Sequence, residues 1–211
     1  MGKVNLAARR GAKANRRKAI VAQKRKAEAI GGTLAGQVAR AAAAPIRCCL
    51  LSERLFDNGM GTLILARGDA FGQCVVAGFL LDTFGLGVKD VMFRPIETGK
   101  LASYVDLLGS ATPMVTIEPS YARKLLRDLV MWSGSRGLQP HPDFAAVERL
   151  FGDVDPQLCE DAFEFGHGGK PLYVADLSEM PPLVGGRTDQ LSAELQLGDF
   201  DYVVSVEEAA E

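Results

Sequence analysis

The polar residues that could carry out chemistry gather between positions 141 and 167. His141, Asp143, Asp153 and Asp155 combine one imidazole with three carboxylates, and His167 follows twelve residues after the last of them. These groups can bind a divalent cation or transfer protons. Hydrolysis of a phosphodiester would be the natural reaction. One interpretation is therefore a metal-dependent, phosphodiesterase-like hydrolase built on these four residues.

Local structure explains the same residues equally well. Asp143 can cap a helix, while Asp153 and Asp155 lie in a Gly-Asp and Asp-Pro turn. His141 stands between two prolines, and His167 stands in a glycine-rich turn where a left-handed residue is useful. Catalysis is thus one alternative, and a set of caps and turns is the other.

Other types of chemical site find less support in the chain. The sequence lacks the Gly-x-Ser-x-Gly pattern of a nucleophilic serine. Its four cysteines, Cys48, Cys49, Cys74 and Cys159, form no Cys-x-x-Cys pair and have no matching histidine cluster. We expect buried, reduced thiols in a cytoplasmic protein, without zinc or another cofactor. Gly85-Leu86-Gly87 lacks the third glycine of a dinucleotide-binding motif and predicts a tight turn.

Charge is distributed very unevenly along the chain. The first 26 residues hold ten basic side chains and no acidic one, whereas residues 27–211 hold 14 basic and 26 acidic side chains. Clustered Lys and Arg neutralise phosphates and release counterions, which favours nucleic-acid binding. Alanines between the charges resemble the extensions of ribosomal and other RNA-binding proteins, which slightly favours RNA. The predicted contacts are Arg9, Arg10, Lys13, Arg16, Arg17, Lys18, Lys24, Arg25 and Lys26.

Three alternatives for this basic arm stay open. It can be a solvated tail, or it can fold back onto the acidic body of its own chain. An Arg-rich, acid-free start is also typical of a mitochondrial presequence, although this one lacks Ser and half of its charges are Lys. The arm has few large aliphatic residues to bury, so we expect it to be disordered or a solitary helix.

The remaining chain predicts an α+β domain in which a small antiparallel sheet is covered by three or more helices. Strands come first and helices follow, which disfavours a doubly wound parallel sheet. We expect a basic arm at 1–32, the α+β domain at 33–180 and an irregular acidic tail at 181–211. The predicted strands are 46–51, 62–66, 72–81, 91–96 and 114–117, with a hairpin at 163–174; the predicted helices are 33–44, 99–108, 119–136 and 143–151.

Four segments of the chain together resemble a known signature. They are YARKLL at 121–126, GLQPHPDF at 137–144, FGDVDP at 151–156 and FEFGHGGKPLYV at 163–174. They are similar to the signature of an uncharacterised bacterial protein family, and the likeness covers roughly residues 60–175. The resemblance implies no activity, cofactor or catalytic residue.

These observations favour a non-catalytic nucleic-acid-associated or adaptor protein. The basic arm would supply affinity for nucleic acid, and the acidic body would bind a protein partner. No apolar run reaches the roughly 18 residues that a membrane-spanning helix needs, so we expect no membrane partner. The metal-dependent hydrolase is the alternative.

Overall fold

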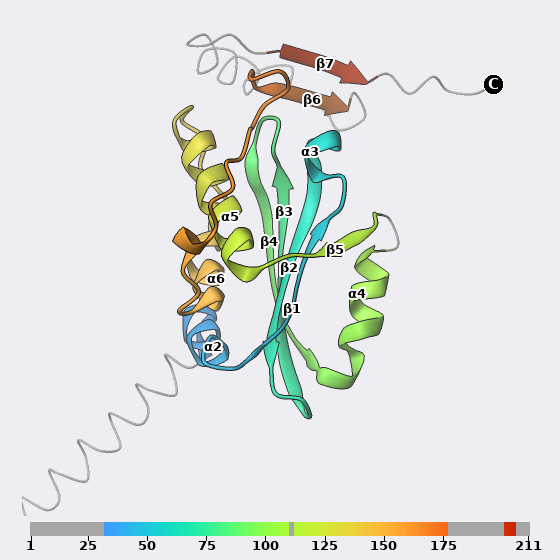
Figure 1. The fold of residues 1–211 in the computed structure, drawn as a ribbon, viewed down its shortest axis with the longest axis vertical. Helices are drawn as coiled ribbons and strands as arrows, with labels where there is room; N and C mark the ends of the chain where they lie inside the picture. Colours follow the sequence, from blue (N-terminus) through green and yellow to red (C-terminus); the bar gives the residue numbers. More distant parts are fainter. Residues whose placement is uncertain (1–31, 110–111, 177–200, 206–211) are drawn as a thin grey trace, which may run out of the picture.

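A five-stranded antiparallel sheet forms the centre of the molecule (Figure 1). The computed structural model describes residues 32–109, 112–176 and 201–205. The strands lie in the order β4-β3-β2-β1-β5. Their bounds are β1 (Ile46–Ser52), β2 (Met60–Gly68), β3 (Gln73–Asp82), β4 (Gly87–Glu97) and β5 (Met114–Thr116). The predicted α+β class with a small antiparallel sheet is confirmed.

The central strands are apolar on both sides because helices cover both faces of the sheet. Leu63 to Ala66 of β2 are buried without interruption. Successive residues of a strand point to opposite faces, so a continuous apolar run requires two covered faces. The β2–β3 hairpin is in register from the Met60–Asp82 pair to the Gly68–Cys74 pair.

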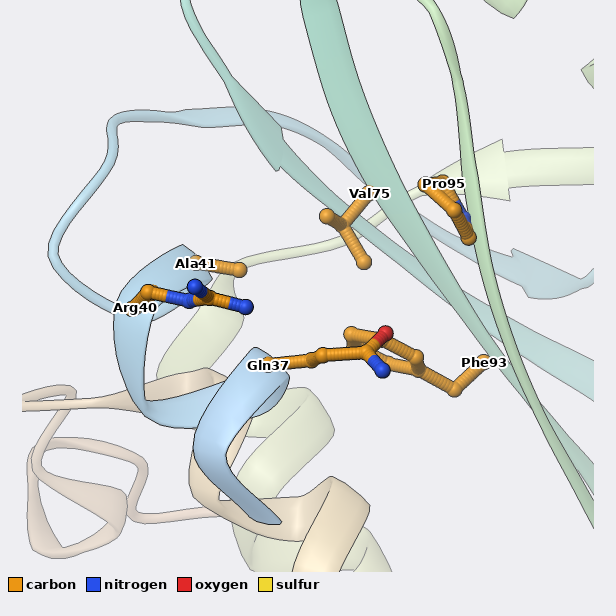
Figure 2. A pocket seen from close by; sticks show the side chains of 6 residues that line it. All are labelled: Gln37, Arg40, Ala41, Val75, Phe93 and Pro95. Atoms are coloured by element: carbon orange, nitrogen blue, oxygen red, sulfur yellow. The ribbon is translucent and has the colours of Figure 1, made fainter. Parts of the chain in front are cut away.

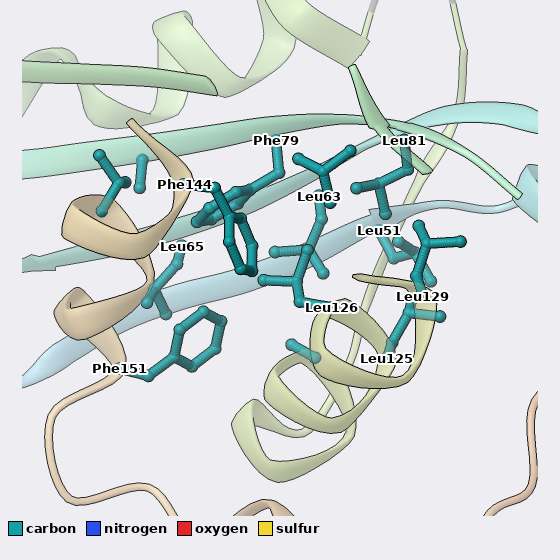
Figure 3. Close-up of a cluster of buried hydrophobic side chains, with 14 of the residues drawn as sticks. Leu51, Leu63, Leu65, Phe79, Leu81, Leu125, Leu126, Leu129, Phe144 and Phe151 are labelled. Carbon is teal, nitrogen blue, oxygen red and sulfur yellow. The ribbon is translucent and has the colours of Figure 1, made fainter. Parts of the chain in front are cut away.

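The larger helical layer packs on one face of the sheet. It consists of α2 (Leu34–Ala41), α5 (Pro119–Gly134), α6 (Phe144–Val147) and the 3₁₀ turn η2 (Glu148–Phe151). Figure 3 shows how the sheet side chains meet the helical ones in this core. The buried residues labelled there are Leu51, Leu63, Leu65, Phe79, Leu81, Leu125, Leu126, Leu129, Phe144 and Phe151.

The smaller layer lies on the opposite face (Figure 1). Here the 3₁₀ turn η1 (Thr98–Lys100) leads into α4 (Leu101–Gly109). Ile64 and Val76 of the sheet form a second core with Leu101 and Tyr104 of this layer. The sheet is therefore enclosed between helices, with α5 and its neighbours forming the thicker cover.

Several predicted element ends agree with the structure, and one helix was missed. Thr33 caps α2, since its side chain accepts a hydrogen bond from the Gly36 N–H at 3.2 Å. The predicted helix at 143–151 consists of the short α6 followed by η2. The one-turn helix α3 (Leu55–Asn58) was not predicted. A further 3₁₀ turn, η3 (Pro156–Leu158), follows the predicted Asp-Pro turn.

The predicted hairpin at 163–174 is wrong. Only His167 and Lys170 form an isolated antiparallel bridge, and the segment Phe163–Phe165 is not a strand. Backbone hydrogen bonds run elsewhere, from Gly166 N to Thr83 O and from Leu172 N to Phe84 O. Apart from the His167–Lys170 bridge, this segment therefore docks beside the end of β3 instead of pairing with itself.

The strand that follows pairs with the acidic tail. β6 (Leu172–Asp176) and β7 (Asp201–Ser205) form a separate two-stranded parallel sheet, with Leu172 opposite Asp201. The predicted irregular tail thus includes a strand. The rest of the tail beyond residue 205, the stretch 177–200 and residues 1–31 of the basic arm lie outside the described residues.

Within the described ranges, no helix has both the length and the apolar character needed to cross a membrane.

Gly59 offers a test of how tightly α3 is joined to the sheet. It ends α3 at φ 72°, and a Cβ there would lie 2.1 Å from the Phe84 ring. Gly59→Ala should lower the free energy of unfolding by about 2–4 kcal/mol, because the left-handed backbone and the displaced ring both cost energy. Urea unfolding followed by circular dichroism measures the change.

Gly99→Ala is the matched control, since nothing lies within 4 Å of a Cβ at that position. It should change stability by no more than about 1 kcal/mol. Equal stability of the two variants would contradict the described junction between α3 and Phe84.

Candidate functional site

His141, which lies between Pro140 and Pro142, connects this segment to the edge strand β4. Its backbone N–H donates to Val88 O at 3.1 Å, and its Nδ1 accepts from the Asp143 N–H at 3.2 Å. That acceptor role leaves the proton on Nε2, which faces Asp90 Oδ1 at 3.6 Å. The imidazole is thus engaged on both sides by neighbouring structure.

The carboxylates predicted beside it have separate local environments. Asp143 occupies the N-cap position of α6 without a side-chain capping bond, which corrects the prediction. Its backbone (φ −80°, ψ −7°) is helical, whereas capping requires an extended N-cap residue. Asp155 is extended and accepts from the Gln157 N–H at 2.9 Å, so it caps η3. The Asp153 side chain is fully exposed, with Oδ1 4.0 Å from Arg67 Nη2.

His167 lies away from these groups, on the end of β3. Its exposed ring makes an edge-on contact with Phe84, with 5.4 Å between ring centroids. His141, Asp143, Asp153, Asp155 and His167 are all described, and nowhere among the described residues do three His, Cys, Asp or Glu side chains come together to hold a metal. The structure therefore does not assemble the residues of the hydrolase hypothesis into one centre.

The Gly85–Gly87 turn uses its backbone donors internally. Asp82 Oδ1 accepts from Phe84 N at 3.0 Å and from Gly85 N at 2.8 Å. Gly87 has φ 80°, and a Cβ there would lie 2.5 Å from Ser133 Oγ. The segment is a tight turn packed against α5, as predicted, and these two amides already have a carboxylate acceptor.

Arg67 is the residue that sequence reasoning missed. It lies at the end of β2 with only 5 % of its surface exposed. Nη1 donates to Ala42 O at 2.6 Å and to Ala44 O at 2.8 Å, and Nη2 donates to Phe151 O at 2.7 Å. Burial lowers the pKa of Arg67, while the nearby Asp153 opposes that change. This guanidinium joins the end of α2 to the end of η2.

A second arginine holds the same loop from the α5 side. Arg123 Nη1 donates to Gly152 O at 2.9 Å and to Val154 O at 2.6 Å, while its Nε pairs with Glu148 Oε1 at 2.7 Å. Arg127 Nε adds a contact to the same carboxylate oxygen at 3.0 Å. The FGDVDP segment is thus shaped by two guanidinium groups that bind its carbonyls.

The aromatic and sulfur groups are packed as structural elements. Trp132 lies against Phe165, with 5.6 Å between ring centroids, and under Arg136, whose guanidinium carbon is 4.1 Å from the ring. All four cysteines are free, and only Cys48 is partly exposed. Burial, with smaller contributions from Cys48 and Glu118, raises the pKa of Cys49 to about 12, which keeps that thiol protonated and unreactive.

The surface formed by the described residues includes two open hollows with different linings. The first, of about 290 Å³, lies between α2 and the β3–β4 side of the sheet (Figure 2). Its lining contains a guanidinium and an amide but no carboxylate: Gln37, Arg40, Ala41, Val75, Phe93 and Pro95. We call it the α2 hollow.

The second hollow, of about 400 Å³, lies between the start of α5 and η3. Three carboxylates line it, from Glu118, Glu160 and Asp161, together with the exposed Leu158. We call it the acidic hollow. Its charge disfavours phosphate, whereas the α2 hollow is compatible with phosphate.

The nine arm residues predicted to contact nucleic acid lie outside the described residues. Comparisons with known proteins yield no match, either among family models, among curated proteins or among solved structures. The resemblance of the four signature segments therefore stays a prediction.

The Glu148 cluster gives a pH-dependent test of the site. Burial alone raises the pKa of Glu148, but the hydrogen bonds and charges of Arg123 and Arg127 outweigh it and hold the pKa below its ordinary value of 4.5. The carboxylate therefore stabilises the fold above that pH, and this contribution is lost as the pH falls through the folded pKa. Glu148→Gln should lower the free energy of unfolding by about 3 kcal/mol at neutral pH. The free energy of unfolding of this variant should also decrease less as the solution is acidified.

Asp57→Asn is the control, because Arg54 and Asp57 form an ion pair at the surface. Their side chains are 63 % and 68 % exposed to solvent, respectively. This substitution should change stability by at most about 0.5 kcal/mol. Urea denaturation from neutral pH to about pH 3 compares the variants. An unchanged loss of stability with falling pH in Glu148→Gln would show that this carboxylate does not stabilise the loop.

Proposed function

We propose that the protein is a non-catalytic nucleic-acid-associated or adaptor protein of the cytoplasm. Its basic arm binds the phosphate backbone, with a slight preference for RNA, and its acidic domain presents a surface to a protein partner. The observation that carries the proposal is the segregation of charge, with ten cations and no anion in the first 26 residues.

Counterion release explains why this segregation matters. A segment with closely spaced Lys and Arg gains affinity from each phosphate it neutralises, without reading the base sequence. Residues 27–211 carry a net charge of −12 and would be repelled from the same backbone. The proposal therefore assigns backbone affinity to the arm.

Internal contacts in the folded domain support this division. Arg67, Arg123 and Arg127 bind carbonyls or Glu148 of their own chain, and Lys124 pairs with Asp128 at 2.6 Å. These cations cannot turn to phosphate without uncovering the groups that they now satisfy. These four cations are thereby committed to the fold.

The acidic hollow supports the adaptor half of the proposal. Its three carboxylates and Leu158 match a protein segment that carries basic and apolar side chains. Free thiols suit a reducing compartment, which supports the cytoplasmic assignment.

A salt titration tests the arm directly. The full chain should bind single-stranded RNA with an affinity that falls steeply with salt. If about five phosphates are neutralised, log K against log[salt] should have a slope of about −3.5 on a single strand and about −4.5 on duplex DNA. Removing residues 1–31 should abolish both the binding and its salt dependence in a filter-binding assay.

Two further variants control for chain length and for charge elsewhere. Replacing the nine predicted arm residues with Gln keeps the length and should weaken binding as much as the deletion does. Removing residues 206–211, which include three glutamates, should not weaken binding. Unchanged affinity after loss of the arm would refute the proposed function.

A further inference from the structure

We infer that the α2 hollow binds one nucleobase of the single strand whose phosphates the arm holds. This inference rests on the proposed function and adds to it a place on the folded domain where a base is recognised. The hollow combines an aromatic ring, an amide and a guanidinium around one concave space (Figure 2).

The sheet side of the hollow provides apolar surface for stacking. Phe93 and Pro95 come from β4 and Val75 comes from β3, where Val75 and Pro95 are opposite each other in the register. Phe93 is partly buried and packs against the main core, so its ring is held in place. Bases stack on aromatic side chains regardless of their identity, because every base has a π-face.

The α2 side of the hollow provides polar groups that can bind a nucleotide. Arg40 is exposed on α2 and lines the hollow, and the flat face of its guanidinium can stack on a base while the residue keeps its contact within the chain. The Gln37 amide can pair with a base edge, as amide side chains do in nucleic-acid complexes. With no carboxylate in the lining, the hollow does not repel a nucleotide as the acidic hollow does.

The hollow lies directly where the basic arm joins the domain. Gln37 Nε2 donates to Gly32 O at 3.1 Å, so a side chain that lines the hollow also contacts the last residue of the arm. A strand whose phosphates follow the arm toward residue 32 would arrive at this hollow. The next nucleotide of that strand could then reach the concave, non-acidic surface of the α2 hollow.

The size of the hollow is compatible with a single base. At about 290 Å³ it lies near the lower limit of small-molecule sites, which are about 300–1,000 Å³. A stacked duplex presents its bases edge-on within the helix, so none could enter without being turned out. The occupant is therefore a base of a single strand.

Binding of two matched oligonucleotides to the full chain tests the inference. One is a short single-stranded RNA, and the other has the same phosphates but lacks the bases in its central positions. The full chain should bind the first more tightly. Phe93→Leu should weaken binding of the base-bearing strand by about five- to a hundredfold and leave the abasic strand unchanged, as measured by fluorescence anisotropy.

Phe71→Leu is the matched control, since Phe71 is 91 % exposed at the β2–β3 turn and does not line the hollow. It should leave both affinities unchanged. If Phe93→Leu does not fold, judged by circular dichroism, the double variant Gln37→Ala and Arg40→Lys on the surface of α2 takes its place. This variant keeps the positive charge, so it should weaken binding of the base-bearing strand alone.

The outcomes separate the hollow from the arm. Equal affinity of the full chain for the two strands, or an effect of Phe71→Leu in place of Phe93→Leu, would overturn the base site while leaving the arm proposal standing. Failure of the full chain to bind either strand would overturn both.

Discussion

Guanidinium groups that bind backbone carbonyls hold the described fold together. Arg67 connects Ala42 and Ala44, just after α2, to Phe151 at the end of η2. Arg123 reaches Gly152 and Val154 from α5. Buried charge is costly unless it is hydrogen-bonded. The two Nη groups of Arg67 meet three carbonyls, although its buried Nε has no hydrogen-bond partner among the described residues. The loop carbonyls and the two arginines therefore stabilise one another. The position of α2 on the sheet, and with it the α2 hollow, depends on this arrangement.

The same constraint bears on function. Cations that satisfy the protein's own carbonyls and carboxylates are not available to an external anion, and the domain as a whole is acidic. Phosphate affinity would therefore come from the basic arm, while the domain contributes shape and stacking surface. With this division, one protein chain can bind the phosphate backbone of a nucleic acid weakly and also recognise the nucleic acid at one local site. The acidic hollow would remain open to a protein partner.

Regular elements could be predicted from local sequence pattern, whereas long-range contacts could not. The unbroken apolar run in β2, the Thr33 cap and the three- and four-residue spacing of Leu125, Leu126 and Leu129 indicated their elements directly. Arg67 looked like an ordinary charged residue at a strand end, because its three acceptors lie 23 to 84 residues away. The segment from Phe163 to Val174 has the alternating pattern of a hairpin. In the structure, however, the carbonyls of Thr83 and Phe84 accept backbone hydrogen bonds from this segment.

The candidate catalytic residues illustrate the same limit. Capping was predicted for Asp143, whose side chain makes no capping bond, whereas Asp155 in the predicted Asp-Pro turn caps η3. Spacing alone placed His141 beside three carboxylates, but in the structure its ring faces Asp90, some fifty residues earlier in the chain. The α2 hollow had no signature in the sequence, because α2 and β4 contribute side chains from distant positions.

The central claim is that the arm, and not the folded domain, supplies electrostatic affinity for nucleic acid. The most direct test is the nucleic-acid content of the protein purified from cells at low salt and again after a wash at about 1 M salt, where the Debye length falls to about 3 Å. We predict that ribonuclease-sensitive nucleic acid accompanies the full chain at low salt, leaves it in the wash, and is absent from a chain beginning at residue 32. Nucleic acid that stays with the shortened chain, or a full chain free of nucleic acid at low salt, would contradict the account.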